Sequence, residues 1–169
     1  MLVGLGVGLI SSLAVFLVTE KLDLPAEALK WISLPYGLGA IIGGIATFAL
    51  ATKITPRRLL QTGLLVNGMG IILAGLSTKL WITMTAQFII ALLQPAIFVG
   101  NNALVMQHTD QNFIGRVMGI RTPLMTGAML LMMSAAGVLK NTLSLILVYL
   151  LAGLCFFAGL LITVPKGSR

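Results

Sequence analysis

Charged residues are scarce in this chain. Asp, Glu, Lys and Arg make up only 9% of its 169 residues, whereas 58% are hydrophobic. Soluble globular domains average about 25% charged residues. So little charge excludes a water-soluble globule, and the composition predicts an α-helical protein whose main partner is the lipid bilayer, because a helix satisfies its own backbone hydrogen bonds in hydrocarbon.

Cysteine and histidine occur once each, as Cys155 and His108. A single cysteine excludes an internal disulfide and a cysteine metal cluster, so we expect no metal site and no cofactor. The chain also contains no His-Glu-x-x-His motif, no Ser-His-carboxylate set and no phosphate-binding glycine loop with lysine. We therefore expect that it is not an enzyme.

Acidic residues are outnumbered by basic ones, four against eleven, which gives a net charge of +7. In a soluble protein this excess would suggest nucleic acid as a partner. Here the cations stand between apolar runs, so membrane topology explains them better and no nucleic acid is expected. Asp, Glu, His and Lys do not occur deep inside any apolar run, so a titratable residue for coupling would have to lie elsewhere.

Six apolar runs follow one another along the chain, each close to the 20 or so residues that a helix needs to cross a bilayer. They lie at 2–19, 32–52, 59–77, 81–106, 122–139 and 143–164. The connections are short, so neighbouring helices should run antiparallel. The predicted fold is an all-α membrane protein in which one domain, residues 1–169, holds six transmembrane helices.

The loop charges predict the orientation in the membrane, because cytoplasmic loops carry an excess of Lys and Arg. One set of connections holds seven cations and a single acid, Asp110. Its cations are Lys53, Arg57, Arg58, Arg116, Arg121, Lys166 and Arg169. The other set balances its four lysines with three acids. The first set should be cytoplasmic, so we expect a multi-pass protein of the plasma (inner) membrane with both termini in the cytoplasm.

The fourth apolar run carries a polar stripe. Gln87, Gln94 and Asn101 are seven residues apart, so they share one helical face. Carboxamides are costly in hydrocarbon unless they meet a partner or water, so this face should point at protein or at an aqueous cavity. Two interpretations stay open: interhelical hydrogen bonds that hold the bundle together, or the lining of a substrate path.

Small and flexible residues mark two further runs. Gly39 and Gly43 lie on one face of the second run, where glycines let another backbone approach closely. Met125 and Met129 lie in the fifth run, and thioether side chains suit surfaces that accept several shapes. Close packing within the bundle and sliding contacts with another half are both possible for these residues.

Two polar connections carry a family resemblance. The stretch ATKITPRRLL, followed by QTG, resembles the Gly-x-x-x-Asp-Arg-x-x-x-Arg-Arg signature of the major facilitator superfamily, and NFIGRVMGI resembles an Arg-Gly-Arg-Val-x-Gly run. The chain thus resembles the C-terminal half of such a transporter, and among these the bacterial drug, macrolide and siderophore exporters. Thr52 stands where the signature has Asp, and Ile114 replaces the first arginine of the other run.

The resemblance implies two six-helix halves with substrate bound between them near the membrane midplane. It implies that the first and fourth runs line the cavity, the second and fifth face the other half, and the third and sixth are peripheral. The expected substrate pathway comprises Ser11, Ser12, Gln87, Gln94, Asn101 and Asn102. The expected packing or half-interface residues are Gly39, Gly43, Met125 and Met129. The expected cytoplasmic loop motifs comprise Lys53, Arg57, Arg58, Gly115, Arg116 and Gly119.

The expected function is therefore half of a secondary transporter that exports small amphipathic molecules, as multidrug efflux proteins do, by alternating access. Its partners would be a small-molecule substrate and either an N-terminal half or a second copy of the chain. The start MLVGLGVGLI lies inside an apolar run, so we expect a fragment of a longer protein, with a split subunit or a homodimer as alternatives. A six-helix membrane scaffold or assembly protein that transports nothing is the alternative function.

Overall fold

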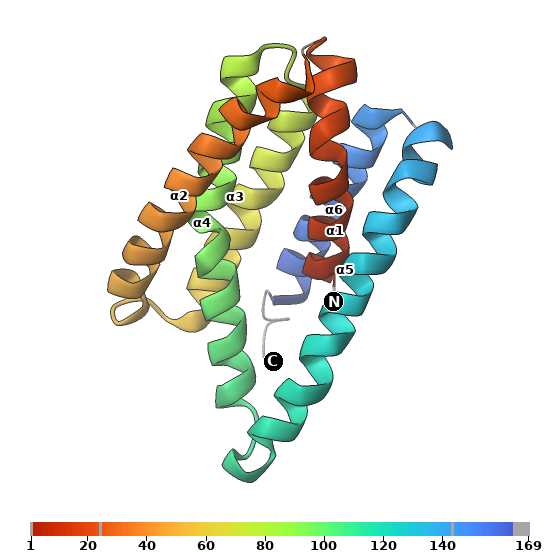
Figure 1. The fold of residues 1–169 in the computed structure, drawn as a ribbon. Coiled ribbons are helices and arrows are strands. Elements are labelled where there is room, and N and C mark those ends of the chain that lie inside the picture. The colour runs from red at the N-terminus through yellow and green to blue at the C-terminus, as the bar shows by residue number, and fades with distance from the viewer. Residues whose placement is uncertain (1, 24, 143, 164–169) are drawn as a thin grey trace.

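The computed structural model describes residues 2–23, 25–142 and 144–163, with positions 2–4, 11, 12, 15, 26 and 139–142 described by their backbone only. The described residues form six α-helices joined by short connections (Figure 1). The helices are α1 Leu2–Phe16, α2 Leu29–Ala51, α3 Pro56–Leu76, α4 Leu80–Gln107, α5 Ile114–Thr142 and α6 Leu145–Thr163. The start of α1 and the end of α6 lie toward the same end of the bundle.

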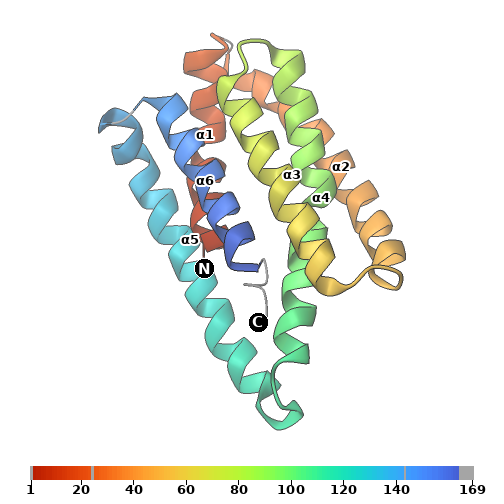
Figure 2. The same cartoon turned by 180° about the vertical axis from the view of Figure 1, so that it is seen from behind.

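The helices pack in a continuous series. Helix α2 packs along α4, α4 along α3, α3 along α6, α6 along α1, and α1 along α5, as the two opposite views show (Figure 2). If α1, α2 and α3 change places with α4, α5 and α6, respectively, every helix in the series keeps equivalent neighbours. The bundle is therefore two similarly arranged three-helix units that meet where α3 packs on α6.

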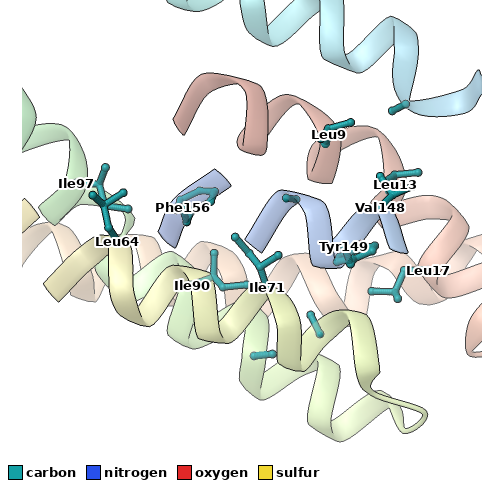
Figure 3. Packing of buried hydrophobic residues seen from close by; sticks show 14 of the residues in the cluster. Leu9, Leu13, Leu17, Leu64, Ile71, Ile90, Ile97, Val148, Tyr149 and Phe156 are labelled. Carbon is teal, nitrogen blue, oxygen red and sulfur yellow. The ribbon is translucent and has the colours of Figure 1, made fainter. Parts of the chain in front are cut away.

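The core lies where α1, α3, α4 and α6 come together. Leu13, Leu64, Ile71, Tyr149 and Phe156 are almost completely buried there (Figure 3). Glycines of α3 allow the helices to come this close, because residues of α4 and α6 occupy the space where larger side chains of α3 would lie. The core is thus assembled by the inner helices, and α2 and α5 form the two ends of the series.

The outward faces are strongly apolar. On α2, Ile45 and Phe48 are 70% and 81% exposed, and on α6 Leu161 and Ile162 are 74% and 73% exposed. Exposed apolar surface on this scale is suited to lipid or to another apolar partner, and not to water. The observed bundle thus has the surface of a membrane protein.

Five of the helical stretches in the described residues are long and apolar enough to cross a membrane: α2, α3, α4, residues 111–138 and α6. The α-helical part of α1 has 15 residues and continues as a π-helical turn at Leu17–Lys21. Burial lowers the pKa of Lys21, whose Nζ donates to the Gly75 carbonyl at this end of the bundle. Five candidate membrane-spanning helices are thus present in the described residues, and a sixth crossing stays a prediction.

The polar stretch 107–123 is largely helical, which corrects the expected start of the fifth helix at position 122. Only His108–Asp110 lie outside helical turns, a 3₁₀ turn covers Gln111–Phe113, and α5 begins at Ile114. Arg116 and Arg121 are therefore helical residues. Hydropathy indicates where a helix enters hydrocarbon, but the backbone adopts the helix earlier, in turns that are exposed. Helix α2 likewise begins at Leu29, before the apolar run at 32.

Candidate functional site

A half-open cavity of about 310 Å³ is formed by residues of α1, α2, α3, α4 and α6. Its volume is at the lower end of the roughly 300–1,000 Å³ typical of small-molecule sites. Most lining residues are apolar, and the polar ones are Ser33, Tyr36, Asn67, Gln87 and Gln94. An apolar wall with a few polar groups is the usual composition of a site for an organic ligand.

Gln87 and Gln94 line this cavity together, because seven residues bring a helix back to the same face. Gln87 is 6% exposed and Gln94 is half-buried. Neither carboxamide forms a hydrogen bond with any residue that the structure describes. The described residues therefore show no interhelical hydrogen bonds from these glutamines. Both carboxamides are available to a ligand or to water.

Asn101 and Asn102 do not line the cavity with the two glutamines. Gly100, beside them, packs on the first turns of α3, where an added β-carbon would lie 2.7 Å from the Pro56 carbonyl oxygen. This part of α4 is thus at the end of the bundle. Asn102 is exposed, and its Oδ1 accepts a hydrogen bond of 2.9 Å from Nη1 of Arg121 on α5. Asn102 thus makes a contact within the α4–α5 hairpin, and its place on the substrate pathway stays a prediction.

Ser11 and Ser12 belong to α1, but their side chains lie outside the described residues, so their place on the pathway stays a prediction. The same helix contributes Val7, Ile10 and Ala14 to the cavity wall.

Sequence reasoning missed Asn67 as a cavity residue. It lies on α3, a helix that the family resemblance places at the periphery. In the structure Asn67 is fully buried and lines the cavity. The available signal was that it is the only Asn in the run 59–77. Tyr36 and Ser33 of α2 were missed as well.

Gly39 and Gly43 pack against α4 of the same chain, which favours close packing within the bundle over sliding contacts with another half. A β-carbon at Gly39 would lie 2.6 Å from the Phe88 carbonyl oxygen, and one at Gly43 would collide with the main chain of Leu92. The glycines of α2 that face open space are Gly37 and Gly44.

Met125 and Met129 have different surroundings on α5. The main chain of Met129 packs on Gly8 of α1, where an added β-carbon would lie 2.5 Å from the Met129 carbonyl oxygen. Met125 is half-buried beside Ile120 and Leu124, in a shallow hollow of the α5 surface. Met129 therefore belongs to packing within this chain, whereas the hollow beside Met125 is open.

The expected loop motifs gather at the end of the bundle where α2 meets α3 and α4 meets α5. Arg57 donates from Nε and Nη2 to the Thr163 carbonyl, at 2.8 and 2.5 Å, and Gln61 Nε2 donates to the same oxygen at 3.0 Å. This clamp joins the start of α3 to the last residue of α6. Lys53 and Arg58 are exposed.

The second motif lies on the first turns of α5. The guanidinium of Arg116 lies 5.7 Å from the centre of the Phe113 ring, a cation–π distance. Gly115 and Gly119 have open space where a side chain would stand. This segment is thus helical and exposed, and none of the residues that the structure describes packs against its two glycines.

The described residues contain no group of three or more His, Cys, Asp or Glu side chains that could hold a metal ion. The model of the Major Facilitator Superfamily matches residues 1–168. Neither a curated protein nor a solved structure matches the chain. A match over nearly the whole length shows that this chain belongs to the major facilitator superfamily of membrane transporters.

Proposed function

We propose that the chain is the C-terminal half of a secondary active transporter that exports small amphipathic molecules by alternating access. The observation that carries this proposal is the cavity lined by Gln87 and Gln94, whose carboxamides have no hydrogen-bond partner among the residues that the structure describes. The second half would be an N-terminal six-helix unit or another copy of the chain. The protein would lie in the plasma membrane with both termini in the cytoplasm.

The shape of the bundle supports a substrate path between α1 and α4. These two helices both line the cavity, yet they do not pack along each other, so the space between them is kept open by their contacts with α3 and α6. A buried polar group without a partner is costly in an apolar surrounding. Gln87 and Gln94 are therefore best explained by a cavity that admits water or substrate.

The distribution of charge supports the proposed orientation. Lys53, Arg57, Arg58, Arg116 and Arg121 belong to the end formed by the α2–α3 and α4–α5 connections. The opposite end combines its lysines with the acidic residues between α1 and α2. Positive charge is enriched on the cytoplasmic side of membrane proteins.

The first test is to sequence the DNA upstream of the Met1 codon and to express the chain with any adjacent six-helix reading frame in efflux-deficient bacteria. Efflux of an amphipathic fluorescent dye would then be compared for wild type and Gln94→Leu at matched membrane abundance. We expect Gln94→Leu to abolish or alter efflux. The control is Gln111→Leu, the same replacement at an exposed position outside the cavity.

Normal efflux by Gln94→Leu would remove this residue from the substrate path. If wild type exports no dye of a broad panel, and Gln87, Gln94 and Asn101 can all become Leu without consequence in the cell, the scaffold or assembly function is favoured.

A further inference from the structure

The inner wall of the cavity contains a polar atom that the transporter fold does not explain. Asn67 lies in the middle of α3, between the buried Leu64 and Ile71, and is fully buried itself. A carboxamide in such a position replaces an apolar side chain that would pack equally well in the surrounding core. Its presence therefore calls for a polar partner inside the bundle.

The hydrogen bond that Asn67 makes decides which of its atoms is left over. Asn67 Nδ2 donates to the Gly63 carbonyl oxygen at 3.1 Å. A carbonyl oxygen can only accept, so the amide nitrogen must face Gly63 and the amide oxygen must face away from it. That oxygen, Oδ1, is buried and has no hydrogen-bond partner. Buried acceptors in native proteins are nearly always paired. Asn67 is 0% exposed, so a donor for Oδ1 would have to enter through the cavity that this residue lines and displace the side chains that cover it.

The rest of the cavity indicates what kind of donor this is. None of the described residues lining it is charged, and its apolar wall includes Ile71, Ile90 and Phe156. An organic cation entering this space would lose its hydration without meeting an opposite charge from the described residues of this chain, which is unfavourable. A neutral group with an O–H or N–H bond would meet an acceptor and leave no charge unpaired.

We propose that Asn67 Oδ1 is a hydrogen-bond acceptor for ligand, and that the cavity takes uncharged, largely apolar molecules carrying one hydroxyl or N–H donor. Gln87 and Gln94, on the facing helix α4, supply further polar contacts to the same molecule. This inference rests on the proposed function in using the same cavity. It adds the ligand class and a specificity-determining residue on a helix outside α1 and α4.

Matched pairs of probe molecules test the proposal directly on the full chain in lipid nanodiscs. Indole and N-methylindole differ by one N–H donor, as 2-naphthol and 2-methoxynaphthalene differ by one O–H donor. Binding would be measured by equilibrium dialysis, with empty nanodiscs subtracting partition into lipid. We expect the donor compound of at least one pair to bind about tenfold more tightly than its methylated partner, as expected when a buried acceptor loses its donor.

Equal binding within both pairs, including no binding at all, would overturn the proposal, because water alone would then satisfy Oδ1. This comparison uses only the wild-type protein, so it does not depend on how a variant folds. A third probe, the naphthyltrimethylammonium ion, tests the charge preference: binding as tight as that of 2-naphthol would overturn the assignment to neutral ligands.

The variant Asn67→Leu tests whether Asn67 causes the preference for donor compounds. It should bind each donor compound no better than its methylated partner, while Asn112→Leu, the same change at an exposed position, keeps the wild-type preference. A preference retained in Asn67→Leu would overturn the role of Asn67. These are binding measurements, so donor-selective binding without dye efflux would contradict the proposed transport alone, and efflux without donor selectivity would contradict only this inference.

Discussion

Gly43 of α2 lies directly on the main chain of Leu92 of α4, with no room for a β-carbon between them. Gly8 of α1 lies in the same way on the main chain of Met129 of α5. The two crossings occupy corresponding places in the two three-helix units, but the glycine is on α2 in one and on α1 in the other. Close backbone approach, which small residues permit in membrane bundles, thus occurs at both crossings, with the glycine on a different helix in each.

Replacing Gly43 with Ala should destabilise the bundle by about 1–3 kcal/mol, because the added methyl group would force α2 away from α4. Gly44→Ala provides a matched control, since nothing lies within 4 Å of its missing side chain. There the better helix propensity of alanine should leave stability unchanged or raise it by up to about 1 kcal/mol. Thermal unfolding in nanodiscs would compare the two variants. Equal melting temperatures would contradict the packing.

Gln87→Leu should leave stability unchanged or raise it by up to about 1 kcal/mol while impairing transport, because the carboxamide faces the cavity without a hydrogen-bond partner among the described residues. If Gln87 held helices together through hydrogen bonds, the same substitution would instead lower stability. Chemical unfolding in nanodiscs and dye efflux would be measured on the same variant. A loss of stability together with normal efflux would favour the scaffold interpretation.

Arg57→Ala should loosen the last turn of α6. Three donor nitrogens from Arg57 and Gln61 meet at the Thr163 carbonyl, and Arg57 supplies two of them. Arg57 is exposed, so we expect a loss of about 1 kcal/mol, confined to this turn. Hydrogen exchange followed by mass spectrometry should show several-fold faster exchange for amides near Thr163. Arg58→Ala is the control at a neighbouring exposed arginine, and faster exchange in both variants would indicate a general charge effect instead.

Asn102→Asp should strengthen the link between α4 and α5. The Oδ1 of Asn102 already accepts a hydrogen bond from Arg121 at 2.9 Å, and a carboxylate would make the acceptor charged. Asn102 is exposed, so the gain should be at most about 1 kcal/mol and should fade as salt is added. Melting temperatures at low and high salt, for Asn102→Asp with and without Arg121→Gln, would measure the coupling. A gain that persists without Arg121 would contradict the pairing.

Local physics explains which features could be predicted from the chain alone. Apolar runs of bilayer length predict a helical membrane protein, because each helix pairs its own backbone whatever its neighbours are. The seven-residue spacing of Gln87 and Gln94 places both on one face for a similar reason, since helix periodicity depends only on the backbone. The structure accordingly brings these two residues to one cavity.

Tertiary packing decided what each face meets. Gly43 and Gly44 are neighbours of the same type, yet one is covered by α4 and the other is open, because coverage depends on a helix far along the chain. Asn67 and Asn102 show the same dependence: one lines the cavity, and the other pairs with Arg121 at the end of the bundle. Hydropathy cannot separate these cases, since lipid and protein interior are equally apolar, and only the arrangement of helices distinguishes them.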